Sequence, residues 1–77
     1  MLVYYDFETT GLNQFHDKVI EYCFIKENQN NEIITSLINP QKDIPEIVTR
    51  ITSINNKMVE NSPLFQNQVG EILEFLN

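Results

Sequence analysis

The sequence of 77 residues carries a formal net charge of −6 and a single cysteine. This length suits one small domain, which buries only about 60% of its unfolded surface, and one cysteine excludes an internal disulfide or a cysteine-rich zinc site. The negative charge disfavours strong, sequence-independent binding of nucleic acids, because proteins of that class present a basic face.

The first predicted element is a strand over Leu2–Glu8, which is rich in aromatic and aliphatic residues. Side chains alternate between the two faces of a strand. One face carries Val3, Tyr5 and Phe7, and the other carries Leu2, Tyr4, Asp6 and Glu8. We expect the first face to pack and the second to carry chemistry.

Two further strands follow a polar loop. Gly11 allows a tight turn at low steric cost, and residues 13–17 form the loop. The β-branched and aromatic segment Val19–Lys26 predicts a second strand, and Glu32–Ile38 predicts a third. The asparagine-rich turn at residues 28–31 suits a hairpin, because Asn tolerates a positive φ.

The remainder of the chain predicts helices. Asp43 and Glu46 are spaced as a capping box for a helix over Ile44–Ile51, and Asn55 is a candidate N-cap for a second short helix. A final helix from about Leu64 presents an apolar stripe that needs a sheet to cover. The stripe consists of Phe65, Val69, Ile72, Leu73 and Leu76.

Asp6 and Glu8 place two carboxylates on one face of the first strand, roughly 7 Å apart along it. Mg²⁺ and Mn²⁺ prefer oxygen ligands, and one or two carboxylates with waters and substrate phosphates usually complete the shell. Two such cations about 4 Å apart activate a water and stabilise the leaving oxygen in phosphodiester hydrolysis. Cations also supply positive charge at the scissile phosphate, so the acidity of the chain does not exclude a metal-dependent nuclease.

The whole segment Asp6–Leu12 is more specific than its two carboxylates, because acidic pairs two residues apart are common on solvated strands and turns. It reads D-F-E-T-T-G-L and resembles D-x-E-T-T-G-L, the first motif of the DEDD family of 3′–5′ exonucleases, the family of the DNA polymerase III proofreading subunit. The later order is similar too: a D-K-V-I-E strand, a third strand ending near a proline, an Ile-Pro helix, a capped I-N-N-K-M-V turn and a helix beginning P-L-F. The resemblance implies an α/β, ribonuclease H-like exonuclease fold, of which this chain supplies three antiparallel strands followed by helices.

The resemblance covers the N-terminal half of a domain. Residues 1–77 are expected to form the N-terminal portion of a single exonuclease domain, because the second and third motifs of the family have no counterpart here. The chain is therefore interpreted as a fragment or a reduced relative. Ser53 departs from the family, which usually has glycine at this turn.

The resemblance implies that Asp6 and Glu8 are the catalytic metal ligands. Asp6 is similar to the carboxylate that bridges both cations, and Glu8 is similar to the ligand of the cation on the nucleophile side. His16 and Glu21 have the spacing of the third motif, but they are not interpreted as catalytic, because that motif needs a helix and they lie in a loop and a strand.

Four residues after Glu8 are implied to bind substrate. Thr9 resembles the residue whose backbone contacts the 3′-terminal nucleotide, with a structural role in the turn as an equal alternative. Leu12 resembles an apolar wedge against the terminal base, with core packing as the alternative. Thr10 and Gly11 are interpreted mainly as turn geometry, with their backbone available to line the nucleotide pocket.

The activity implied for the intact domain is metal-dependent 3′–5′ exonucleolysis of DNA, which releases nucleoside monophosphates. It would use two divalent cations, Mg²⁺ or Mn²⁺, and a base supplied from outside this chain. RNA stays open as a substrate, because nothing in the sequence reads the 2′-hydroxyl. The implied partners are a single-stranded or frayed 3′ end, together with a polymerase or the missing C-terminal half.

Two alternatives stay open: a truncated, non-catalytic remnant that acts as a binding or assembly module, and an acidic α/β domain with an accidental motif. No segment approaches the roughly 20 apolar residues of a membrane span, and no signal peptide is visible. The lone Cys23 fits a reducing compartment. We therefore expect an intracellular, cytoplasmic protein without membrane contact.

Overall fold

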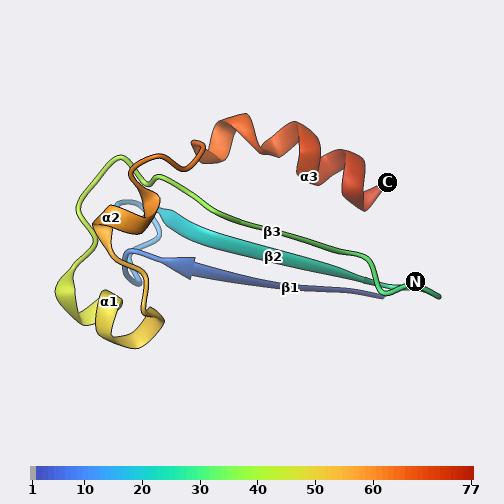
Figure 1. The fold of residues 1–77 in the computed structure, drawn as a ribbon, viewed down its shortest axis with the longest axis horizontal. Coiled ribbons are helices and arrows are strands. Elements are labelled where there is room, and N and C mark those ends of the chain that lie inside the picture. Colours follow the sequence, from blue (N-terminus) through green and yellow to red (C-terminus); the bar gives the residue numbers. More distant parts are fainter. Residues whose placement is uncertain (1) are drawn as a thin grey trace.

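The computed structural model, which describes residues 2–77, has one antiparallel sheet with the strand order β1-β2-β3 (Figure 1). β1 spans Leu2–Thr9, β2 spans Val19–Glu27 and β3 spans Ile33–Leu37. All three predicted strands are confirmed, and their ends differ from the prediction by no more than one residue. Asn31 completes the turn between β2 and β3 with a φ of 47°, as expected for an asparagine-rich hairpin.

The register between β1 and β2 changes near the end of β1. Glu8 lies opposite Glu21, whereas Thr9 lies opposite Val19. Ile20 is therefore the extra residue of a β-bulge, which locally reverses the faces to which neighbouring side chains point. Ile20 packs with the residues of the helical end of the molecule, while Val19 stays with the aromatic cluster on the sheet.

One face of the sheet is covered by α3, which spans Val69–Leu76 and lies along the strands in Figure 1. Tyr22 and Phe24 of β2 are buried there against Ile72. The rings of Phe7 and Phe24 meet edge to face with centroids 5.7 Å apart, a favourable aromatic geometry. We call this surface the covered face. It carries Val3, Tyr5 and Phe7 of β1, Tyr22 and Phe24 of β2, and Ile34 of β3.

The opposite surface, here called the open face, carries Leu2, Tyr4, Asp6 and Glu8 of β1 with Glu21, Cys23 and Ile25 of β2. Leu2 and Tyr4 are more than half exposed, as is Ile33 on β3. The residues of β1 are therefore divided between two faces as predicted, but the predicted packing face is only partly packed, because Tyr5 is 69% and Phe7 37% exposed.

The short helices lie at the end of the sheet where β1 stops (Figure 1). α1 spans Glu46–Thr52 and α2 spans Asn56–Val59. Their residues form a second apolar cluster that consists of Ile20, Ile44, Ile54 and Val59, with Leu37 and Val48 packed against it. None of the helices within residues 2–77 is long and apolar enough to cross a membrane.

The predicted capping box at Asp43 and Glu46 is wrong. Pro45 is the N-cap of α1, its ψ of 143° is extended, and no side chain caps the helix. The helix therefore starts at Glu46 instead of Ile44, and the Glu46 carboxylate pairs with Arg50 at 3.0 Å. Asp43 lies too far upstream to cap a helix that begins after the proline.

The predicted N-cap of α2 is confirmed, because the Asn55 Oδ1 accepts a hydrogen bond of 2.9 Å from the Met58 amide. Ser53 also adopts the conformation that its family position requires: it ends α1 with a φ of 64°, in the left-handed region that glycine occupies most easily.

The final helical segment begins differently from the prediction. A 3₁₀ turn, η1, spans Phe65–Asn67, and α3 starts only at Val69. The Tyr22 hydroxyl donates a hydrogen bond of 2.9 Å to Gln68 Oε1 at this junction, which ties the start of α3 to the sheet. The predicted stripe holds at Ile72 and Leu76, whereas Phe65, Val69 and Leu73 are exposed.

We predict that Ile72→Ala lowers the free energy of unfolding by about 2–4 kcal/mol, because it leaves a cavity between α3 and the aromatic residues of β2. Ile72 is 7% exposed, and its neighbour Leu73 is 59% exposed. Leu73→Ala is the matched control and should change stability by about 0.5 kcal/mol or less. Urea denaturation followed by circular dichroism measures both, and equal losses would show that α3 does not dock through Ile72.

Candidate metal-binding face and substrate loop

The open face gathers carboxylates at the end of β1. Asp6 and Glu8 share this face because they are two residues apart on a strand. Asp6 is exposed, and Glu8 is half-buried. The sequence did not single out Glu21 as a neighbour of Glu8, yet the register places these two residues directly opposite each other. This pair is the last one of the regular register that starts at Leu2 opposite Glu27, and the bulge at Ile20 follows it.

The donor set on this face fits a hard cation that also binds substrate. Among residues 2–77, no three His, Cys, Asp or Glu side chains converge to hold a metal ion. The candidate ligands are therefore the two carboxylates of β1, Asp6 and Glu8. Mg²⁺ typically keeps several waters and takes one or two carboxylates together with substrate phosphates, so this pair suits a shared site better than a closed protein cage.

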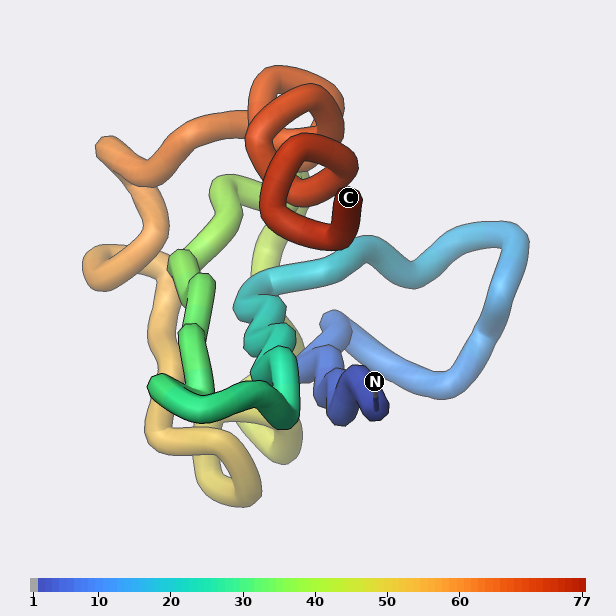
Figure 2. The backbone as a smooth tube through the Cα atoms, turned by 90° about the vertical axis from the view of Figure 1, so that its right-hand side faces the viewer, coloured from blue at the N-terminus to red at the C-terminus, as the bar shows by residue number. Residues whose placement is uncertain are grey.

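The segment from Thr9 to Lys18 forms a loop that projects to one side of the molecule (Figure 2). Asp17 holds this loop together. Its Oδ1 accepts a 2.8 Å hydrogen bond from the Thr10 hydroxyl, and its Oδ2 accepts one of 2.8 Å from the Asn13 amide. The Thr10 amide also donates a hydrogen bond of 2.8 Å to Lys18 O. We call the loop held by Asp17 the substrate loop.

Gly11 serves this loop in a way that differs from the prediction. Its φ is not positive, so the turn does not need glycine for its backbone conformation. A Cβ atom at Gly11 would instead lie 2.5 Å from Asp17 Oδ2. Glycine is therefore needed because the carboxylate that organises the loop approaches the backbone closely.

Thr10 is 1% exposed, and its hydroxyl both donates to Asp17 and accepts from the Lys18 amide at 2.9 Å. The Thr9 hydroxyl donates to Gly11 O at 2.6 Å. This contact favours a structural role in the turn for the Thr9 side chain. Substrate contacts at Thr9, Thr10 and Gly11 thus remain predictions that concern their backbone atoms.

Leu12 is fully exposed. The alternative in which Leu12 packs into the core is therefore wrong. The side chain stands on a loop that is fixed on both sides, by the Thr9 hydroxyl and by the Asn13 amide bonded to Asp17. An exposed apolar side chain on such a support is available to contact a ligand.

A feature missed by the sequence analysis is the position of Lys42. Its Nζ donates to His16 O at 3.0 Å and lies 3.4 Å from Asp17 Oδ1. These partners are far apart in the sequence, so only the folded chain brings them together. The hydrogen bond from the Asn13 amide, followed by that from Thr10 and the proximity of Lys42, lowers the pKa of the Asp17 carboxyl below its ordinary value.

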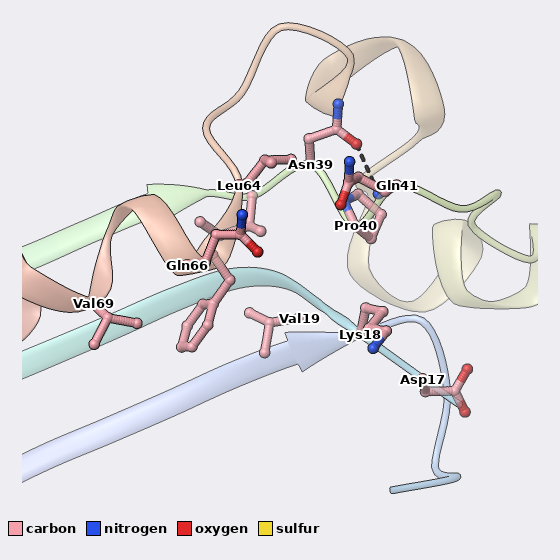
Figure 3. A pocket seen from close by; sticks show the side chains of 11 residues that line it. Asp17, Lys18, Val19, Asn39, Pro40, Gln41, Leu64, Gln66 and Val69 are labelled. Atoms are coloured by element: carbon pink, nitrogen blue, oxygen red, sulfur yellow. Dashed lines mark hydrogen bonds between the residues drawn. The ribbon is translucent and has the colours of Figure 1, made fainter. Parts of the chain in front are cut away.

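A pocket of about 410 Å³ lies beside the base of the substrate loop (Figure 3). It is bounded by residues 17–19, residues 38–41 and residues 64–66, with Val69 at its far end. Asn39 Oδ1 accepts a 2.9 Å hydrogen bond from the Gln41 amide at the rim. Neither Asp6 nor Glu8 lines this pocket, so it is distinct from the carboxylate pair.

We predict that the Asp17 pKa measured by ¹³C NMR is below the ordinary value of about 3.9, and that it rises in Thr10→Val, which removes a hydroxyl donor. A carboxyl whose folded-state pKa is depressed contributes stability that is present above its unfolded pKa and lost as the pH falls through its folded pKa. The variant should therefore show a weaker pH dependence of stability below pH ~5. An unchanged Asp17 pKa in Thr10→Val would contradict the loop geometry.

Comparisons with known proteins agree with this geometry. Residues 3–77 match the family model RNase_T, described as exonuclease. The chain is 35% identical over 75 residues to the PolC-type DNA polymerase III of Caldanaerobacter subterraneus subsp. tengcongensis, covering 95% of this chain and 5% of that protein. It is 36% identical over 75 residues to the 3′-5′ exonuclease DinG of Bacillus subtilis, covering 94% of this chain and 8% of that protein.

The fold is similar to that of exonuclease X, solved in complex with 5′ overhanging duplex DNA, with a TM-score of 0.80 and 22% sequence identity. That match covers 94% of this chain and 43% of the exonuclease X chain. The chain thus spans less than half of a solved exonuclease and only a small part of the polymerase and DinG relatives. The predicted ribonuclease H-like fold is confirmed, and the chain belongs to the exonuclease family of the DEDD type, of which it represents the N-terminal part.

Proposed function

We propose that this chain is the N-terminal portion of a single domain that hydrolyses DNA from its 3′ end and releases nucleoside monophosphates. The observation that carries the proposal is the position of Asp6 and Glu8. They share the open face of β1 and lie directly before the ordered substrate loop. Family membership supports hydrolysis of phosphodiester bonds, and the named relatives support DNA as the substrate.

Asp6 and Glu8 would hold two divalent cations, Mg²⁺ or Mn²⁺, together with the scissile phosphate. The cations would supply Lewis-acid activation of a water and charge stabilisation at the phosphate. The protein's own part is to hold two carboxylates on a paired strand, so that their positions are set before substrate binds. The covered face contributes by fixing β1 against β2 through aromatic packing.

The substrate loop would place the terminal nucleotide beside the carboxylates. Leu12 presents its side chain to solvent and is proposed to contact the terminal base. Thr9, Thr10 and Gly11 are proposed to contact the nucleotide through their backbone. The general base and any further metal ligands would come from outside residues 1–77, because no third converging donor lies within residues 2–77.

A second candidate function is a binding or assembly module without catalysis. The observation that favours it is the two-carboxylate donor set, since the described residues hold no complete metal site. In that case the open face and the free edge of β1 would bind a polymerase or another domain. The two candidates differ in one measurable respect, which is the dependence of DNA cleavage on Asp6.

We predict that Mn²⁺ broadens the NMR amide signals of residues 5–9 in the chain, because paramagnetic cations broaden the signals of nuclei close to their ligands. Asp6→Asn should abolish this effect, because it replaces a charged oxygen ligand by a neutral amide. Thymidine monophosphate should strengthen the broadening, since phosphate oxygens complete an octahedral shell. Glu74→Gln, on the exposed side of α3, is the matched control and should leave the effect intact.

The same Asp6→Asn variant tests catalysis in the full-length gene product. Loss of 3′-end degradation with unchanged stability would support the exonuclease proposal. Cleavage that persists in Asp6→Asn would remove Asp6 from the active site. A full-length product that binds DNA and degrades none, with or without the substitution, would favour the binding module.

We predict that Leu12→Ala leaves the melting temperature nearly unchanged, because its side chain buries no surface, and that it raises the KM for single-stranded DNA in the full-length product. A buried leucine would instead cost about 2–5 kcal/mol. Thermal melts and single-turnover kinetics measure the two effects separately. Normal KM in the variant would exclude contact between Leu12 and the terminal base.

A further inference from the structure

Phe15 stands on the substrate loop with no role in the fold. Its side chain is 79% exposed, and it belongs to neither apolar cluster. Among the described residues, Phe15 is the most exposed aromatic side chain, ahead of Tyr5 at 69%. Burial of a phenylalanine ring contributes about 1.5–3 kcal/mol, so binding of a flat apolar ligand over this ring would be favourable. The first-motif resemblance ends at Leu12, so it assigns nothing to this position.

The backbone beneath Phe15 is ordered by the loop's own hydrogen bonds. Asn13 Oδ1 accepts from the Phe15 amide at 2.9 Å and from the His16 amide at 3.2 Å. The Asp17 amide donates to Asn13 O at 2.8 Å. Phe15 is therefore held on a small turn that is anchored at both ends, and this limits the entropy lost when its ring binds a ligand.

Two of the five lysine and arginine residues lie on the substrate loop or contact it. Arg50 and Lys57 are paired with glutamates on their own helices, and Lys26 lies over the ring of Phe75 near the end of α3. Lys42 Nζ donates to His16 O at 3.0 Å and pairs with Asp17 Oδ1 at 3.4 Å, whereas Lys18 follows Asp17 on the loop itself. A loop that carries an exposed aromatic ring and a lysine has the two groups that single-stranded nucleic acids bind, with bases stacked and phosphates paired.

Phe15 is also within reach of the substrate proposed above. Phe15 is three positions after Leu12, and three residue steps span at most about 10 Å. Successive bases of one B-form strand are about 3.4 Å apart, so this span corresponds to no more than about three bases. A strand whose terminal base contacts Leu12 would therefore bring an inner base to Phe15.

From these contacts we infer that Phe15 is a stacking platform for a base one to three nucleotides inside the 3′ end, and that Lys18 binds an adjoining phosphate. This inference deepens the proposed exonuclease function and rests on it for the direction of the strand. The ligand is single-stranded DNA, and the site lies on the substrate loop outside the first motif.

The test uses the chain's lack of tryptophan. Phe15→Trp introduces a single reporter on the substrate loop, and Ile51→Trp introduces one at a matched position on α1, where the native side chain is 77% exposed. Each variant is titrated with an eight-nucleotide oligothymidylate at low salt in EDTA, which prevents cleavage. We expect quenching of the tryptophan emission at position 15 and none at position 51. Quenching at neither position, or equally at both, would overturn the inference.

Two further variants measure the contribution of each contact to binding of the same oligonucleotide, followed by anisotropy of a 5′ dye. Phe15→Ala should weaken binding by about fivefold or more, as expected for loss of one stacked base. Lys18→Met should reduce the slope of log affinity against log salt by about 0.7, the value for one phosphate contact on a single strand. Binding unchanged in Phe15→Ala would overturn the stacking inference.

The outcomes for this inference and for the exonuclease proposal can be separated. If position 15 is quenched while the full-length product degrades no DNA, the binding loop stands and the catalytic proposal fails. If the full-length product degrades 3′ ends with the same KM in Phe15→Ala and wild type, the exonuclease proposal stands and the stacking inference fails.

Discussion

The pairing of β1 with β2 is the constraint on which the other features depend. β1 has no other strand partner within residues 2–77, so its register is set by one ladder and by the aromatic packing beneath it. Because the side-chain period of a strand is two, a slip by one residue would exchange its faces. Asp6 and Glu8 would then lie on the covered face, and Tyr5 and Phe7 would lie on the open face. Burial of Tyr22 and Phe24 on the covered face therefore also keeps the carboxylates accessible.

The edge of β1 that has no strand partner within residues 2–77 runs beside Asp6 and Glu8, the two carboxylates of the incomplete metal site. An unpaired edge strand exposes amide and carbonyl groups that can pair with another segment, and the aromatic residues Tyr5 and Phe7 remain partly exposed beside it. The exonuclease X chain contains more than twice the length that this chain matches. A segment that pairs with this edge would lie next to Asp6 and Glu8, which is where additional metal ligands would have to come from.

The parts of the structure that the sequence predicted well are those set by local pattern. Alternating apolar residues identified all three strands, and the Asn55 cap is a contact between residues three apart. The capping box failed because Pro45 stayed extended and delayed the helix. The position of Lys42 at the substrate loop could not be predicted, since it depends on how the chain after β3 returns past the loop. The reason for glycine at position 11 could not be predicted either, because a Cβ atom there would collide with Asp17, and only the folded loop brings Asp17 close.

The order of the substrate loop explains how a short acidic chain could present the nucleic-acid surface proposed above. Its order comes from polar contacts around one carboxylate and not from apolar burial, so Leu12 and Phe15 are not needed to stabilise it. Side chains freed from packing can be exposed at little cost to the fold. The Asp17 carboxylate accepts hydrogen bonds from Thr10, Asn13 and Lys42. These donors offset its negative charge, which reduces its repulsion of a phosphate. The loop therefore presents two exposed apolar side chains on a backbone held by hydrogen bonds, and this preorganisation would reduce the entropy lost on binding a strand.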